Sequence, residues 1–236
     1  MQRYFTNEKN ENGYVLNKDD EYHIKKVMRM KINDCIEIVD NKKVYLCKIK
    51  SLEPLKVDME EEINENNEFD KKIIVVQSLV NENKMDLILQ KGTELGAYSF
   101  YGYKSVNSVI KENNKSDKKV DRWQKIVKES SEQSKRNIIP KVEKIIDLKE
   151  LCELKADLKI ILSVKEKSNS IKNVLQSNRC CDTMIIVIGP EGGFDLKEED
   201  TLVNSGFERV TLGKRVLRTE TASLVALSMI NYEWMV

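Results

Sequence analysis

The chain has 236 residues, of which 33% are charged, and its formal net charge is +1 at pH 7. A chain of this length holds one large domain, or one domain and a small module. No stretch reaches the roughly 18 apolar residues of a membrane span, and the amino-terminal residues lack the apolar core of a signal peptide. These features exclude a membrane-embedded protein and predict a cytoplasmic one.

The charges are unevenly distributed. Residues 1–57 carry 12 Lys and Arg against 9 Asp and Glu, and residues 71–236 carry 28 against 23. Residues 58–70 carry 7 acids and no base. The mildly basic parts permit a nucleic-acid partner without establishing one. We interpret the acidic segment as a solvated linker or an exposed edge, and assign it no function.

The cysteines do not have the spacing of a metal site. The five cysteines form no CxxC pair, and the one histidine is His23. We therefore predict no metal and reduced thiols. The cysteines are Cys35, Cys47, Cys152, Cys180 and Cys181.

The first 57 residues have the pattern of a small β module. Cys35–Val39 and Val44–Ile49 are separated by a polar turn, which predicts a hairpin. Before the hairpin, His23–Met30 has apolar residues three and four apart, which predicts a short amphipathic helix. We interpret His23 as a packing or RNA-facing residue rather than a catalyst.

From Lys71 onward the pattern alternates between strands and helices, which predicts right-handed crossovers and a mainly parallel sheet. A polar loop is expected at 111–117, before a helix that buries Trp123 and Val127. The predicted strands are 73–80, 98–103, 159–164, 184–188 and 208–212, and a further helix is predicted at 85–95.

Strand, glycine-containing loop and helix occur twice in the last 54 residues. Residues 184–188 are apolar and β-branched, which is typical of a strand buried on both faces. After the loop 189–194, Asp195 and Glu198 predict a capping box, and Gly206 the end of that helix. A second loop, 213–218, follows the next strand, and we expect Thr219 to cap the last helix.

Both loops are predicted to leave the carboxyl ends of parallel strands, where α/β proteins bind ligands. Three glycines and a proline at 189–193 allow a ligand to approach the backbone closely. The loop matches neither the dinucleotide fingerprint nor a phosphate loop. Glycines that only turn the chain are the alternative, but the charged residues at 218–222 favour a site.

The segments IGPEGGF (188–194) and LGKRVLRTETA (212–222) resemble the SPOUT class of methyltransferases, and in particular the RsmE family. Segments 89–96 and 122–137 extend the resemblance over essentially the whole chain. The resemblance implies an α/β fold with a knotted SPOUT-type parallel sheet at 71–236 and a PUA-like β-barrel at 1–70. The deep trefoil knot and a homodimer formed through the last helix rest on this resemblance alone.

The family implies S-adenosylmethionine-dependent methylation of N3 of a uridine in 16S ribosomal RNA, within the assembled small subunit. The cofactor residues implied by the resemblance are Leu162, Ser163, Ile188, Gly189, Pro190, Glu191, Gly192, Gly193, Leu212, Gly213, Leu217, Thr221 and Ala222.

Methylation at N3 places negative charge on the ring carbonyls, which a fixed guanidinium stabilises. We expect Arg218 to do this, and Glu220 or Glu191 to accept the proton, without a choice between them. Arg136 is expected to position a phosphate or a base, with an intrachain ion pair as the alternative. The other expected RNA contacts are Arg3, Lys25, Lys26, Arg29, Lys42 and Lys43.

Two alternatives remain open. One is a related SPOUT enzyme that methylates a ribose 2′-hydroxyl, and the residues at 218–222 match the base-modifying family better. The other is an RNA-binding module whose cofactor loops have decayed, but the loops at 189–193 and 217–222 are intact.

Overall fold

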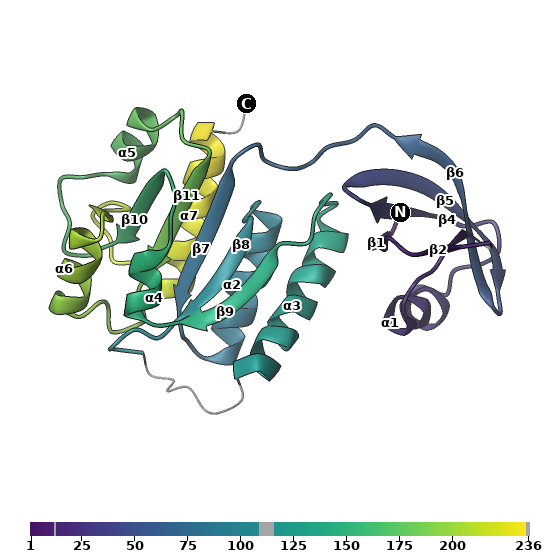
Figure 1. Cartoon of the computed structure of the whole chain (residues 1–236), viewed down its shortest axis with the longest axis horizontal. Coiled ribbons are helices and arrows are strands. Elements are labelled where there is room, and N and C mark those ends of the chain that lie inside the picture. Colours follow the sequence, from purple (N-terminus) through teal and green to yellow (C-terminus); the bar gives the residue numbers. More distant parts are fainter. Residues whose placement is uncertain (12, 109–115, 235–236) are drawn as a thin grey trace. The chain divides into compact units, whose positions relative to one another are not determined.

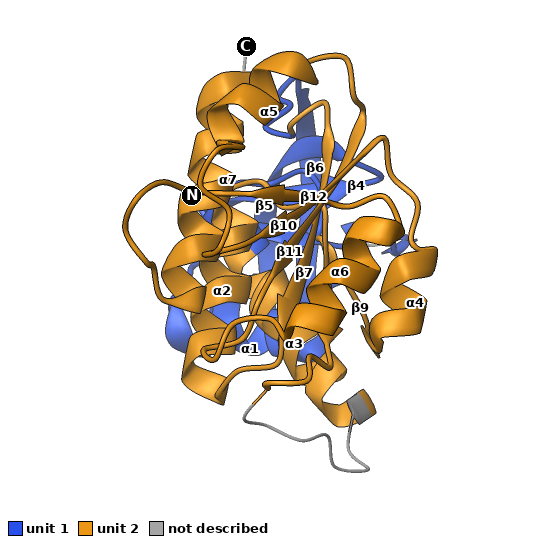
Figure 2. Cartoon of the chain, turned by 90° about the vertical axis from the view of Figure 1, so that its left-hand side faces the viewer, with its two compact units in different colours: residues 1–68, 131–139 blue, residues 69–130, 140–236 orange. Residues whose placement is uncertain are grey.

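The computed structural model describes residues 1–11, 13–108 and 116–234. The contacts divide the chain into two units (Figure 2). Unit 1 comprises residues 1–68 and 131–139, and unit 2 comprises residues 69–130 and 140–236. The return of residues 131–139 to unit 1 differs from the continuous boundaries expected from the sequence.

Unit 1 contains a six-stranded sheet in the order β1-β4-β5-β6-β3-β2. Its apolar core includes Tyr4, Ile24, Ile36 and Val57, which are almost completely buried. The elements are β1 (Arg3–Phe5), β2 (Lys9–Asn10), β3 (Gly13–Tyr14), α1 (Lys18–Tyr22), the π-helix η1 (His23–Val27), β4 (Cys35–Asp40), β5 (Lys43–Leu52) and β6 (Leu55–Ile63).

The predicted hairpin is confirmed. Strands β4 and β5 pair antiparallel, with Val39 opposite Val44. The two turn residues, Asn41 and Lys42, have φ angles of 50° and 70°, as a tight hairpin turn requires.

The predicted helix at 23–30 is only partly correct. The helical segment begins earlier, at Lys18, where the Asn17 side chain accepts a hydrogen bond from the Asp20 backbone. It ends at Val27, and Val27 is exposed. The apolar spacing was misleading because Ile24 is the one residue of that π-helix that is buried.

The first half of the acidic segment is not a linker. Residues 58–63 belong to β6, which pairs antiparallel with β5. Cross-strand ion pairs join Lys43 to Glu62 and Lys50 to Glu60 at 2.9 Å each. Lysines of β5 are therefore paired across the sheet with two of the acids of β6.

Unit 2 is a parallel sheet in the order β12-β10-β11-β7-β8-β9, with α2 and α7 on one face and α4 and α6 on the other (Figures 1 and 2). The strands are β7 (Lys72–Ser78), β8 (Ser99–Tyr103), β9 (Lys141–Ile146), β10 (Leu158–Leu162), β11 (Thr183–Ile188) and β12 (Glu208–Val210). The helices are α2 (Glu82–Glu94), α3 (Ser116–Gln133), α4 (Leu148–Glu153), α5 (Ile171–Ser177), α6 (Leu196–Asn204) and α7 (Thr219–Trp234).

Central strand β11 confirms the prediction for the apolar run 184–188. It pairs in parallel with β10 on one side and β7 on the other, and Ile185, Ile186 and Val187 are fully buried. The capping box of Asp195 and Glu198 is also present, and Gly206 follows α6 with a φ of +89°.

The sequence did not predict strand β9 or the short helices α4 and α5. Strand β9 lies at the edge of the sheet, where Lys141, Glu143 and Lys144 interrupt its apolar residues. The polar loop expected at 111–117 lies mostly outside the described residues, and α3 begins at Ser116.

Candidate active site

A cavity of about 530 Å³ lies at the carboxyl edge of the unit 2 sheet. The loops after β10, β11 and β12 line it together, because these three strands are neighbours in the sheet. All the predicted cofactor residues line the cavity except Thr221, which is exposed on α7. Lys84, Phe194 and Glu199 also line it and were not predicted.

The glycine loop 189–193 is folded tightly. Gly193 has a φ of +72°, a conformation that residues with a Cβ rarely adopt. A Cβ on Gly189 would lie 3.0 Å from the ring of Phe194. The side chain of Asn107 donates a 3.1 Å hydrogen bond to the carbonyl oxygen of Gly193. The loop after β8 therefore supports the glycine loop.

Thr219 does not act as the predicted side-chain cap. Helix α7 begins at Thr219 itself, and the hydroxyl donates to the Gly189 carbonyl oxygen at 2.7 Å. It also accepts a 2.9 Å hydrogen bond from Gln77. Ser223, one turn later, donates to the Gln77 side chain at 2.7 Å. These buried contacts fix the start of α7 against strand β7.

Glu198 attaches the loop after β8 to α6. Its carboxylate accepts hydrogen bonds from the Tyr103 hydroxyl and, at 2.9 Å, from the Ser105 hydroxyl. Burial, followed by the hydrogen bond to Glu198, raises the pKa of Tyr103 well above its ordinary value, so it remains a donor. No sequence motif marks this loop, and only the fold brings it to α6 and the glycine loop.

The opening of the cavity is basic. Arg218 is exposed there, as predicted, and so are Lys214 and Arg215. Within the described part of the chain, no carboxylate lies within ion-pairing distance of these three side chains. Two carboxylates line the cavity, those of Glu191 and Glu199. The charge at the opening therefore suits an anionic ligand that approaches from solvent.

Lys84 joins the two candidate proton acceptors. Its ammonium group contacts the Glu191 carboxylate and lies 3.4 Å from an oxygen of Glu220. The hydrogen bond to Glu191, and then the charge of Glu220, raise the pKa of Lys84. Glu191 lines the cavity but Glu220 does not. A lysine in the first turn of α2 is the signal that could have identified this cluster, since the helix dipole disfavours a cation there.

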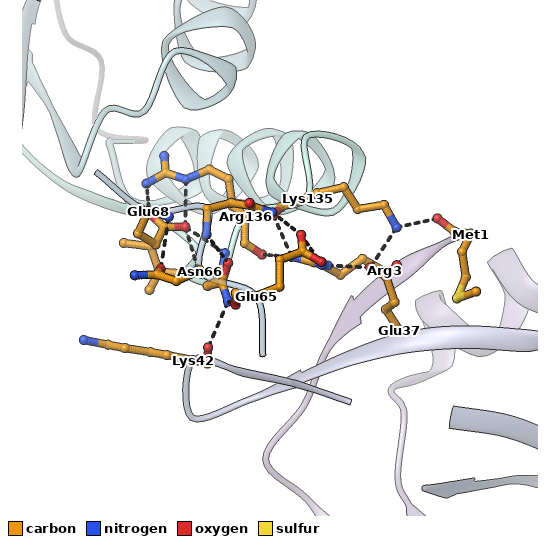
Figure 3. Close-up of polar contacts among 12 residues, drawn as sticks. Met1, Arg3, Glu37, Lys42, Glu65, Asn66, Glu68, Lys135 and Arg136 are labelled. Atoms are coloured by element: carbon orange, nitrogen blue, oxygen red, sulfur yellow. Dashed lines mark hydrogen bonds and ion pairs between the residues drawn. The ribbon is translucent and has the colours of Figure 1, made fainter. Parts of the chain in front are cut away.

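Arg3 is not placed to meet RNA, contrary to the prediction. Its side chain is fully buried in unit 1 (Figure 3). It donates to Glu37 at 2.8 Å and to the carbonyl oxygen of Lys135 at 2.6 Å. It also forms an ion pair of 3.2 Å with Glu65. These partners occupy the guanidinium, which therefore holds residues 131–139 in unit 1.

Arg136 has a similar structural role, which corresponds to the alternative considered for it. Only 5% of its side chain is exposed, and it forms an ion pair with Glu68. Glu68 also accepts hydrogen bonds from the backbone of Asn137 and Ile138, at 2.7 and 3.1 Å (Figure 3). The second half of the acidic segment thus stabilises unit 1, although the sequence suggested no role for it.

The remaining predicted RNA residues lie on the surface of unit 1 or close to it. Lys26, Arg29 and Lys42 are exposed, and the described residues offer them no ion-pair partner. Lys25 forms a 3.1 Å ion pair with Glu21.

Within residues 1–11, 13–108 and 116–234, no group of side chains could hold a metal ion. The same residues contain no helix that is long and apolar enough to cross a membrane.

Two family models match the chain. An RNA methyltransferase domain matches residues 67–231, and an RNA methyltransferase PUA domain matches residues 16–62. The ribosomal RNA small subunit methyltransferase E of Bacillus subtilis is 35% identical, covering 99% of this chain and 97% of that protein. The protein of the same name from Mesomycoplasma hyopneumoniae is 34% identical, covering 97% and 98%.

Solved structures agree with these matches. The ribosomal RNA small subunit methyltransferase E of Neisseria gonorrhoeae, bound to S-adenosyl methionine, has a TM-score of 0.90 at 31% identity, covering 99% of this chain and 98% of that one. The predicted combination of a PUA domain and a methyltransferase domain with a parallel sheet is confirmed, while the SPOUT class and its knot stay predictions. The chain belongs to the RNA methyltransferase family of the ribosomal RNA small subunit methyltransferase E (RsmE) proteins.

Proposed function

We propose that this protein methylates N3 of a uridine in 16S ribosomal RNA, with S-adenosylmethionine as the methyl donor. The observation that carries the proposal is the cavity formed by the loops after β10, β11 and β12. Two similar structures have S-adenosylmethionine bound: the Neisseria gonorrhoeae protein named above and a putative methyltransferase from Legionella pneumophila that is 27% identical, with a TM-score of 0.89.

The residues of the cavity fit this cofactor. Its volume of about 530 Å³ lies in the range of small-molecule sites. Ile188, Leu212 and Leu217 supply apolar walls for an adenine ring, and the glycine loop supplies close backbone groups. Glu199, which is buried in the wall, supplies an acceptor for hydroxyl or ammonium groups. When bound, the cofactor would supply an electrophilic methyl group.

Arg218 is proposed as the catalytic cation. Loss of the N3 proton leaves negative charge on the two neighbouring carbonyl oxygens of uracil. A guanidinium stays charged and forms two parallel hydrogen bonds to oxygen acceptors. Arg218 is exposed beside the cavity and is not neutralised by a carboxylate of the described residues. It is therefore available to the charge that develops during the reaction.

Residues 1–70 are proposed as the RNA-binding domain and residues 71–236 as the methyltransferase domain. In the first, Lys25, Lys26, Arg29, Lys42 and Lys43 would contact phosphates and orient the RNA without reading its sequence. Arg3 and Arg136 are excluded from this surface because they are buried. The substrate is proposed to be the assembled small subunit, which also places the protein in the cytoplasm.

A homodimer is proposed as the assembly. Helix α7 buries Leu227 and Ile230 within unit 2, yet Met229 and Tyr232 are 37% and 89% exposed. A helix with apolar residues on several sides usually has partners on several sides. Light scattering at micromolar concentration should therefore give twice the 27.4 kDa of one chain. A mass of one chain at that concentration would contradict the dimer.

The function is tested in cells with and without the gene. A methyl group on N3 blocks Watson–Crick pairing, so the product should stop reverse transcriptase at one site in 16S ribosomal RNA. Mass spectrometry of the nucleosides should detect 3-methyluridine in the wild type and not in the deletion strain. An unchanged stop pattern together with the loss of a ribose methyl would instead support the 2′-hydroxyl alternative.

A further inference from the structure

Two carboxylates line the cavity, and they differ in access. The side chain of Glu199 is 3% exposed and lies 3.7 Å from both Lys165 and Arg209. The side chain of Glu191, in the glycine loop, is 43% exposed. A base carried on a large RNA reaches the cavity from its open side. Glu191 is therefore the lining carboxylate that such a base can meet.

The charges around Glu191 leave it able to accept a proton. Lys84 contacts Glu191 and lies 3.4 Å from Glu220, so one cation is shared by two carboxylates. The side chain of Glu220 is only 14% exposed and faces Lys84 rather than the cavity. Among the ion pairs of the described residues, one of the two negative charges is thus uncompensated. A proton taken up by Glu191 therefore leaves this group of three without net charge.

The three residues come from three segments. Lys84 lies in the first turn of α2, Glu191 in the glycine loop and Glu220 in the first turn of α7. A cation at the start of a helix opposes the helix dipole and is stable there when carboxylates hold it. This arrangement fixes the glycine loop, at the wall of the cavity, against two helices.

We propose that Glu191 is the catalytic residue that accepts the N3 proton, and that Lys84 and Glu220 are positioning residues that hold and charge-balance it. The inference rests on the proposed function. The N3–H bond breaks as an O–H bond forms on Glu191. The electron pair left on N3 forms the new bond to the methyl carbon, while the methyl–sulfur bond breaks and its electron pair stays on sulfur. The proton then passes from Glu191 to water.

The test uses full-length protein and small ribosomal subunits from cells that lack the gene. Single-turnover methyl transfer is measured from pH 5 to pH 9 for the wild type, Glu191→Gln, Lys84→Met, Lys84→Arg and Glu220→Gln. Calorimetric affinity for S-adenosylmethionine and the melting temperature are measured on the same samples. Glu94→Gln is the matched control, because Glu94 is paired with Lys91 of the same helix α2 at 2.8 Å and does not line the cavity.

General base catalysis contributes about 10²–10⁴-fold, so Glu191→Gln should slow methyl transfer at least about 100-fold. Its affinity for S-adenosylmethionine should stay within about twofold of the wild type, as that group is not proposed to hold the cofactor. Lys84→Met should move the acid limb of the pH profile to higher pH, because the carboxylates lose their cation. Lys84→Arg should restore the acid limb of the pH profile to its wild-type position. Glu94→Gln should change neither the rate of methyl transfer nor the affinity for S-adenosylmethionine.

A rate for Glu191→Gln within about tenfold of the wild type, with the same pH profile, overturns the proposal. A parallel loss of rate and cofactor affinity also overturns it, because Glu191 would then be a cofactor residue. If Glu191→Gln fails to fold, the shift of the acid limb in Lys84→Met decides the question. The proposed function fails separately, when the wild-type protein leaves N3 of uridine unmodified but methylates another atom. The ratio of mutant to wild-type rate can then still be measured on that product.

Discussion

The hydroxyl of Thr219 donates a 2.7 Å hydrogen bond to the carbonyl oxygen of Gly189, and thereby joins the two loops of the proposed cofactor site. The same hydroxyl accepts from Gln77 of strand β7. Thr219 is itself only 6% exposed, and Gly189 lines the cavity. The geometry of the glycine loop therefore depends on a residue at the start of the last helix.

Replacing Thr219 with valine keeps the shape of the side chain and removes the hydroxyl. The Gly189 carbonyl oxygen and the buried Gln77 amide then each lose a partner, which costs about 1–3 kcal/mol in the free energy of unfolding. We expect weaker S-adenosylmethionine binding as well, because the Gly189 carbonyl is released. Urea unfolding and calorimetry measure the two effects. Thr201→Val is the control, since the exposed Thr201 hydroxyl bonds only within its own helix, to the Lys197 carbonyl. Equal stability of both variants would contradict this expectation.

The glycines of the first loop should differ in their tolerance of a side chain. Gly193 has a φ of +72°, so valine there is strained whatever the available space. A Cβ on Gly192 would make an ordinary contact of 3.4 Å with Asn107. We expect Gly193→Val to weaken S-adenosylmethionine binding strongly, Gly192→Val to weaken it less and Gly192→Ala to weaken it little. Calorimetric affinities in the reverse order would show that the backbone conformation of Gly193 is unimportant.

Arg218→Ala should separate binding from chemistry. The side chain is proposed to stabilise charge that exists only during the reaction, so the variant should keep its cofactor affinity. Loss of a group of this kind reduces the rate about 10²–10³-fold. Single-turnover methyl transfer and calorimetry give the two numbers. Lys155→Ala is the control, because Lys155 is exposed just before β10, at the opposite edge of the sheet. An equal loss of rate and cofactor affinity would place Arg218 in the cofactor pocket.

Arg3→Met should destabilise unit 1 by about 3–5 kcal/mol, since it leaves buried carboxylate and carbonyl groups without their donor. Burial alone would raise the pKa of Glu37, but hydrogen bonds from Lys135 and Arg3 outweigh burial and lower it. The stabilisation from Glu37 is therefore present above the ordinary glutamate pKa of about 4.3 and is lost as the pH falls through the lower, folded value.

The difference in unfolding free energy between the wild type and Arg3→Met should accordingly shrink below pH 4 or so. Urea unfolding at several pH values measures it. Lys50→Met removes an exposed ion pair with Glu60 and should leave the free energy of unfolding nearly unchanged at any pH. A pH-independent difference for Arg3→Met would mean that Glu37 does not contribute through its charge.

Local patterns in the sequence predicted the central strands and the loops after them. The apolar run 184–188 could only be buried, and the capping box at Asp195 marked the next helix. The sequence could not predict the contacts that connect distant segments. Asn107 reaches Gly193 only through the order of the strands. A lysine in the first turn of α2 is unusual, but its position does not identify Glu191 and Glu220 as its partners.

Charge was the least reliable guide. Arginine is typical of RNA-binding surfaces, and Arg3 and Arg136 were predicted to bind RNA for that reason. Carboxylates of the acidic segment instead hold both side chains inside unit 1. A sequence gives the sign of each charge but does not identify its partner. Separation along the chain does not single out Glu65 and Glu68 as the partners of these arginines, because many other basic residues lie about as far from them. Arg218, in contrast, belongs to a motif, and it lies at the cavity as predicted.

Because residues 131–139 complete unit 1, this unit is not encoded by a continuous piece of the gene. During synthesis, the chain must reach Ile139 before Arg3 can obtain its carbonyl acceptors at Lys135 and Arg136. Unit 1 therefore cannot be completed until residues 69–130 of unit 2 have also been synthesised. A fragment that ends at Glu68 lacks those acceptors, and it should remain partly unfolded even though every strand of its sheet is present.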